Sequence, residues 1–84
     1  MTPALQAQTR TVIRSYLGEG LRLGRDLTDD EDLLVSGLLD SLSVVRFVAM
    51  LETEFDLVIP PQDITLTNLA SIDAVMIYLE SRGL

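Results

Sequence analysis

The apolar residues of the chain recur with a helical period, most clearly in residues 41–55. A rotation of about 100° per residue places one apolar stripe on this segment, of the width that a core-facing helix needs: Val44, Phe47, Val48, Leu51 and Phe55. The opposite side carries a second, smaller patch: Leu42, Val45 and Ala49, with Arg46 beside them. A helix with a single core stripe should be polar on that side, so the second patch predicts a docking face. Burial of the helix on both sides is the alternative.

Two further helices are predicted, one at each end of the chain. Thr2 can cap the first, with Pro3 at its first position, and Gly18 and Gly20 are expected to end it near Leu17. Its core face is predicted from the spacing of five residues: Leu5, Thr9, Val12, Ile13 and Tyr16. Ser71 can cap the last helix, which Arg82 and Gly83 close. That helix presents four core residues: Ile72, Val75, Met76 and Leu79.

Residues 18–40 form a long connection, and residues 62–66 a single short helical turn that Thr67 and Asn68 interrupt. Pro60 and Pro61 prevent the middle helix from continuing into that turn. Seven leucines can hold the long connection against the bundle: Leu21, Leu23, Leu27, Leu33, Leu34, Leu38 and Leu39. The predicted architecture is therefore an all-α bundle of three main helices plus one short helix, with a long first loop, in a single domain over residues 1–84.

Four consecutive acids, residues 29–32, stand in the long connection. They lack the alternating ligands and the glycine of a calcium-binding loop, so we expect a solvated acidic turn rather than a metal site. The same run is expected to open a short helical turn that leads into Leu33 and Leu34. Gly37 supplies the backbone freedom that brings Asp40 and Ser41 to the surface.

Composition excludes several functions. The chain of 84 residues has a net charge of −7, with six arginines against thirteen carboxylates, so nucleic acid and anionic membranes are poor partners and basic protein surfaces are good ones. It has no Cys, His or Lys, which removes thiol and imidazole catalysis, Schiff bases and the usual zinc sites. No catalytic residue is assigned, and an enzyme is not expected. With neither a membrane span nor a signal peptide in the sequence, a cytoplasmic location is expected.

Ser41 stands at the start of the middle helix, where two interpretations compete. Serine is a preferred helix cap, which would give it a purely structural role. A helix N-terminus also favours an anion, and Ser41 adjoins the surplus apolar patch, so it could instead accept a phosphate ester. A serine that has no activating base in the chain makes better sense as a substrate for another protein.

A family resemblance bears on this choice. The motif Asp40-Ser41-Leu42, the apolar helix closing on Leu51-Glu52-x-Glu54-Phe55, and the following Ile59-Pro60 resemble the acyl carrier proteins over about residues 32–79. The resemblance implies a covalent 4′-phosphopantetheine on Ser41, with Asp40 and Leu42 completing the cofactor-binding motif. It also implies a phosphopantetheinyl transferase that uses coenzyme A and Mg²⁺, and a short third helix that borders the acyl-chain cleft.

The resemblance further implies a function: a stand-alone carrier that holds acyl or aminoacyl groups as thioesters for fatty-acid, polyketide, peptide or related biosynthesis. Its partners would be the transferase, a loading ligase or acyltransferase, and downstream enzymes, which would dock at Leu42, Val45, Arg46 and Ala49. Arg46 stands where fatty-acid carriers commonly have a glutamate, and residues 37–41 look more like freestanding D-alanyl or other aminoacyl carriers. A monomer is expected for such a shuttle. The alternative is an unmodified helical interaction module in which Ser41 is a structural cap.

Overall fold

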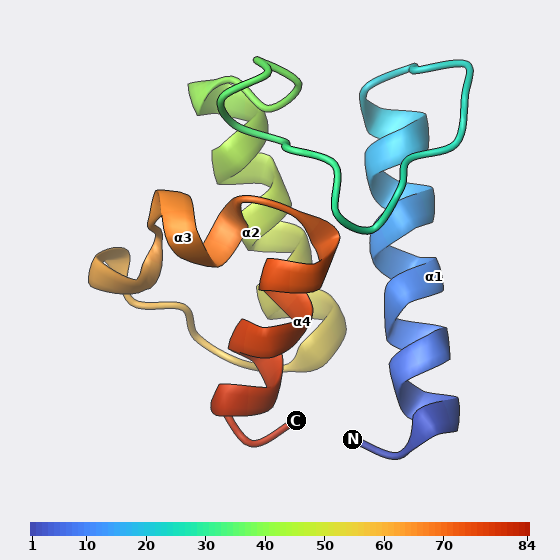
Figure 1. Cartoon of the computed structure of the whole chain (residues 1–84). Helices are drawn as coiled ribbons and strands as arrows, with labels where there is room; N and C mark the ends of the chain where they lie inside the picture. The colour runs from blue at the N-terminus through green and yellow to red at the C-terminus, as the bar shows by residue number, and fades with distance from the viewer.

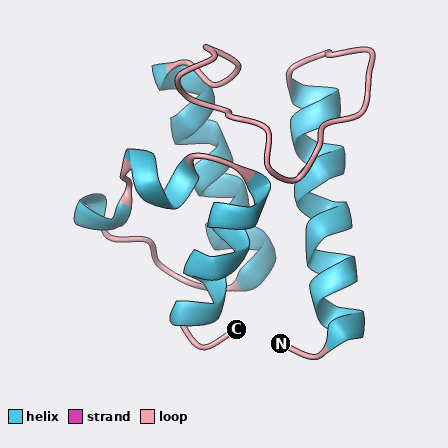
Figure 2. Cartoon of the chain, in the orientation of Figure 1, coloured by secondary structure: helices cyan, strands magenta, loops and turns pink.

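The computed structural model describes all 84 residues and contains helices and loops but no strand (Figures 1 and 2). The elements are α1 (Pro3–Gly20), α2 (Ser41–Phe55), the 3-10 turn η1 (Pro61–Asp63), α3 (Leu66–Leu69) and α4 (Ile72–Ser81). α4 packs against both α1 and α3, and the long first loop runs over one end of the bundle from α1 to α2 (Figure 1). The predicted all-α bundle, with three main helices, one short helix and a long first loop, is confirmed.

The core-facing stripe of α2 lies where its periodicity predicts. Phe47, Val48 and Leu51 are buried, and Val44 and Phe55 pack against the core from its edge. The Phe47 ring stacks on Tyr16 of α1, with the ring centroids 6.0 Å apart. α2 is therefore buried on one side only, and the alternative of burial on both sides is wrong.

α1 differs from its prediction in length and in rotation. Thr2 caps it as expected, because its hydroxyl accepts a hydrogen bond from the Leu5 N–H, and Pro3 is the first helical residue. The helix continues to Gly20, however, because glycine permits helical dihedrals and the tertiary contacts of α1 extend to Leu17. The predicted core face is also partly wrong, since Leu5 and Val12 are exposed. The buried stripe consists of Thr9, Ile13 and Leu17.

The long loop belongs to the core. Leu27, Leu33 and Leu39 are buried, and the other four leucines pack against the core, which confirms the predicted anchoring. The Leu33 N–H donates to the carbonyl oxygen of Ala70 at 2.8 Å. The loop is thus attached to the segment between α3 and α4 as well as to α1.

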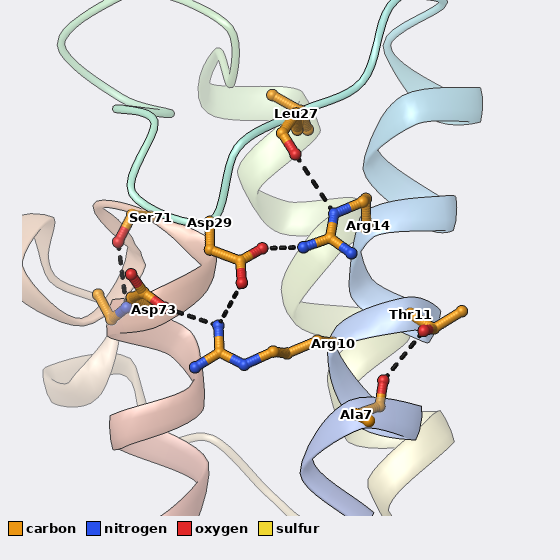
Figure 3. A network of polar contacts seen from close by, with 9 residues as sticks. Ala7, Arg10, Thr11, Arg14, Leu27, Asp29, Ser71 and Asp73 are labelled. Atoms are coloured by element: carbon orange, nitrogen blue, oxygen red, sulfur yellow. Dashed lines mark hydrogen bonds and ion pairs between the residues drawn. The ribbon is translucent and has the colours of Figure 1, made fainter.

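The prediction of a solvated acidic turn is wrong for Asp29. Its carboxylate accepts hydrogen bonds from Arg10 and Arg14 of α1, and Arg10 also pairs with Asp73 at the start of α4 (Figure 3). The Asp29 carbonyl oxygen accepts the Asp73 N–H at 2.9 Å. This network joins α1, the loop and α4, because two arginines one helical turn apart reach the same carboxylate.

Asp30 is exposed and makes no side-chain hydrogen bond or ion pair, as a solvated acidic turn predicts, whereas the other two acids are bound locally. Glu31 forms an ion pair with Arg25, and the Asp32 carboxylate accepts the N–H groups of Leu34 and Val35. The expected helical turn at this point does not form, and the chain makes irregular turns as far as Asp40. No group of three acidic side chains is arranged to hold a metal ion.

The C-terminal half keeps the predicted last helix and shifts the short one. Ser71 caps α4 by accepting the Ala74 N–H at 3.1 Å, and Gly83 follows the helix with a φ of +92°. The short helical turn predicted over residues 62–66 is instead divided between η1 and α3, so Thr67 and Asn68 are helical rather than a break. Thr65 causes the shift, because its hydroxyl accepts the Asn68 N–H and caps α3.

A polar contact holds η1 against α4. The Tyr78 hydroxyl donates to the Asp63 carboxylate at 2.8 Å, and Arg82 donates to the Tyr78 hydroxyl oxygen at the same distance. Burial raises the pKa of Tyr78, so the phenol stays protonated and remains a donor. None of the helices has the length and apolarity that a membrane span requires.

Candidate functional site

The first residue of α2 is Ser41, and the residue that caps the helix is Asp40. Asp40 has an extended backbone, with φ −86° and ψ 179°, and its carboxylate accepts the Ser43 N–H at 2.8 Å. A cap residue needs this extended geometry, whereas Ser41 is already inside the helix. The interpretation of Ser41 as the structural cap is therefore wrong.

The Ser41 side chain is exposed and its hydroxyl makes no hydrogen bond within the protein. Asp40 performs the capping, so the Ser41 hydroxyl has no structural task. The first N–H groups of a helix have no intrahelical acceptor, and the helix dipole adds positive potential there. The structure thus places a free hydroxyl where a phosphate ester would be electrostatically favoured.

Buried residues on both sides hold this hydroxyl in place. On the loop side, Leu39 is buried and its N–H donates to the Leu33 carbonyl oxygen at 2.7 Å. On the helix side, Phe47 is fully buried. Gly37, at φ +82°, turns the chain so that Leu39 points inward while Asp40 and Ser41 remain outside. This confirms the role expected of Gly37 as the residue that exposes Asp40 and Ser41.

The outer side of α2 presents the second apolar patch to solvent. Leu42 is 59% exposed and Val45 64% exposed, and Arg46 and Ala49 are also exposed. All four residues lie on the helix that Ser41 begins, on the side away from the core. We call these four residues the α2 outer face. The structure brings them together as predicted, while their role as a docking surface remains a prediction.

The charges around Ser41 are of both signs. The hydrogen bond from the Ser43 N–H lowers the pKa of Asp40, and the positive charge of Arg46 acts in the same direction. Asp40 is therefore ionised at neutral pH. Arg46 itself makes no ion pair with any carboxylate of the chain.

Next to α2 on the α3 side lies an open apolar hollow of about 210 Å³. Its lining comes from the loop, α2 and the segment around α3: Leu34, Val44, Ile64, Thr65, Leu66 and Leu69. Leu66 is 70% exposed, so apolar surface beside the hollow is left uncovered. The sequence pattern does not mark Ile64 or Leu66, because a four-residue helix has too few turns to show a periodic face.

Comparison with known proteins adds an independent finding. None of the curated proteins compared with the chain matches it. The family model described as the phosphopantetheine attachment site matches residues 10–76, from within α1 to within α4, which is well over half of the chain and includes Ser41. Proteins of this type bear a covalent 4′-phosphopantetheine. The helical bundle, the free hydroxyl at the start of α2 and this match agree, and the chain belongs to the family of phosphopantetheine-binding carrier domains of the acyl carrier protein type.

Proposed function

We propose that the chain is a carrier protein whose Ser41 hydroxyl is the attachment point of 4′-phosphopantetheine. The observation that carries this proposal is that one residue caps α2 while the next residue keeps a free hydroxyl. Asp40 caps the helix, so Ser41 is left exposed with an unbonded hydroxyl inside the segment that matches the attachment-site family. The other exposed serines differ from Ser41: Ser15 and Ser81 lie within helices and away from a helix start, and the hydroxyl of Ser36 in the long loop donates to the Asp32 carbonyl oxygen.

The residues around Ser41 fit the group. A phosphodiester on Ser41 would meet the first N–H groups of α2 and the positive end of its dipole. No side chain of the protein competes for the Ser41 hydroxyl oxygen. The ionised carboxylate of Asp40 lies beside the site, where the family resemblance implies that it assists the Mg²⁺-dependent transferase.

The bound arm would supply a thiol that holds acyl or aminoacyl groups as thioesters. The chain has no Cys, His or Lys of its own, so its residues position the arm and dock partners, and catalysis belongs to those partners. The α2 outer face adjoins Ser41 and is exposed apolar surface that folding does not use. We assign it to docking of the transferase, the loading ligase or acyltransferase, and later enzymes.

The apolar hollow beside α3 is the site that we assign to the cargo. Its apolar lining would exclude water from an aliphatic chain. The family resemblance implies that the short helix beside the cleft, here α3, moves to accommodate such a chain. Arg46 and residues 37–41 favour a freestanding carrier for aminoacyl or specialised acyl groups over a housekeeping fatty-acid carrier. This assignment rests on the family resemblance and on the exposed arginine.

Intact mass spectrometry tests the proposal. The protein is incubated with coenzyme A, Mg²⁺ and a broad-specificity phosphopantetheinyl transferase, and we expect a gain of one phosphopantetheine. Ser41→Ala should abolish the gain, and the matched control Ser15→Ala should retain it, because Ser15 is an exposed helical serine away from α2. Since the chain has no cysteine, a thiol reagent should label only the modified protein. A folded wild-type protein that gains no mass would favour the unmodified interaction module.

A further inference from the structure

The arginines of the chain divide into paired and unpaired groups. Thirteen carboxylates are available to six arginines, and four of these arginines form ion pairs: Arg10, Arg14, Arg25 and Arg82. Arg22 and Arg46 form none, and Arg46 makes no side-chain hydrogen bond either. Arg46 belongs to the α2 outer face, so the unpaired charge lies beside the site of modification. An unpaired guanidinium in so acidic a chain is available to an anionic group from outside.

Arg46 also lines a pocket. The pocket lies between the C-terminal end of α1 and the first turns of α2 and has a volume of about 100 Å³. The pocket is small and partly open to solvent, so it suits the end of one side chain that enters from outside. Seven residues line it, four of them hydrophobic: Tyr16, Leu17, Leu21 and Leu39, with Gly20, Ser43 and Arg46.

An apolar lining beside a guanidinium favours a ligand that carries a carboxylate on a short aliphatic stem. A guanidinium donates two parallel hydrogen bonds to a carboxylate, which gives both charge and shape complementarity. Ser43 lies at the border of the pocket, and the leucines would contact the methylene groups of the stem. Aspartate and glutamate side chains have this structure. A cationic side chain would be repelled by Arg46.

The surroundings of the pocket favour a protein as the source of that carboxylate. Leu42 and Val45 are more than half exposed on the same helix, so a macromolecular surface around the acidic side chain would cover them as well. A free small acid would leave both uncovered. The chain has a net charge of −7, yet at this point it presents a guanidinium that forms no ion pair, although its charge also acts on the nearby Asp40 carboxylate.

We propose that the pocket between α1 and α2 binds an aspartate or glutamate side chain of a partner protein. Arg46 pairs with the carboxylate, and Leu42 and Val45 contact apolar side chains around it. The identity of the partner as an enzyme acting on the Ser41-linked group rests on the proposed function, whereas the carboxylate pocket does not. The net charge attracts basic surfaces, and this pocket then selects partners that also present an acid beside an apolar patch.

Propionate, the side chain of glutamate beyond its α carbon, is the probe. Unmodified ¹⁵N-labelled protein is titrated with sodium propionate, with sodium chloride of the same ionic strength as reference. We expect saturable shifts of the Arg46 side-chain N–H and the Ser43 N–H. Arg46→Gln should raise the dissociation constant by about tenfold or more. The matched control Arg22→Gln removes the other unpaired charge and should leave binding unchanged. Chemical-shift changes of equal size at all the arginines would overturn the proposed carboxylate pocket. An equal loss of propionate binding in Arg46→Gln and Arg22→Gln would overturn it as well.

A second measurement tests whether the carboxylate that occupies the pocket comes from a partner protein or from the cargo. The transferase loads the protein from succinyl-coenzyme A or from butyryl-coenzyme A, two acyl groups of equal length of which only succinyl ends in an acid. We expect the Arg46 signal to be the same in both loaded forms. A shift confined to the succinyl form would assign the pocket to cargo and overturn the partner assignment. Absence of any mass gain would contradict the proposed function while leaving the propionate result standing.

Discussion

Leu33 offers a direct test of whether the long loop is part of the core. Its side chain is fully buried although it lies in a segment without regular secondary structure. Leu33→Ala removes three buried carbon groups, at about 0.8 kcal/mol each in transfer free energy. The cavity left behind adds to this loss, which gives a total of about 2–5 kcal/mol. A domain of this length has a free energy of unfolding of roughly 4–13 kcal/mol, so the expected loss is a large fraction of it.

Val35 provides the matched control, two residues further along the same loop. Its side chain is 85% exposed, so Val35→Ala should change the free energy of unfolding by less than about 0.5 kcal/mol. Urea unfolding, followed by far-ultraviolet circular dichroism, measures both variants. With a urea dependence of about 1 kcal/mol per M, Leu33→Ala should lower the midpoint by roughly 2 M or more.

The result also bears on the position of Ser41. The Leu33 carbonyl oxygen accepts the Leu39 N–H, and Leu39 is the last buried residue before Asp40. If Leu33→Ala lost no more stability than Val35→Ala, the loop would be an appendage rather than core. The account of how Ser41 is positioned would then be refuted.

Two further predictions concern the helix starts. Ser71→Ala should lower the melting temperature by about 4–8 °C, because the lost helix cap is worth about 1 kcal/mol. Ser41→Ala should leave the melting temperature nearly unchanged, because Asp40 caps α2. Equal losses in the two variants would contradict the assignment of Asp40 as the cap. Because folding lowers the pKa of Asp40, its contribution to stability is present above its unfolded-state pKa and is lost as the pH falls through its lower folded-state pKa. Asp40→Asn keeps a capping side chain but removes the charge. Between neutral pH and about pH 3, the urea midpoint should therefore fall less in this variant than in the wild type. An equal fall in both proteins would argue against a lowered pKa of Asp40.

Several features of the protein could be predicted from local sequence alone. The two faces of α2 follow from spacing, because five apolar residues define the core stripe and leave Leu42 and Val45 on the other side. The caps at Thr2 and Ser71 follow from residue type, since a hydroxyl at a helix start bonds an N–H only three residues away. Such features depend only on residues within one or two helical turns of each other, so they can be predicted from the local sequence.

The rotation of α1 and the identity of the cap of α2 required more than local pattern. Periodicity gives the angles between residues but not the direction of the core, and α1 is turned so that Leu17 is buried while Leu5 and Val12 are not. At the start of α2, both Asp40 and Ser41 are good cap residues, and the backbone before the helix decides between them. That backbone is set by Leu39, which the folded loop holds in the core.

Contacts between distant segments were decided by the tertiary structure alone. Asp29 pairs with arginines that precede it by 19 and 15 residues, and Arg10 reaches Asp73 across 63 residues. The pocket at Arg46 is likewise formed from α1, the loop and α2 together. Charge and hydropathy patterns describe each segment by itself, whereas pairing and cavities depend on which surfaces meet. The sequence therefore determined the helices, the serine and the apolar patch beside it, and only the fold decided that Ser41 is left free and Arg46 unpaired.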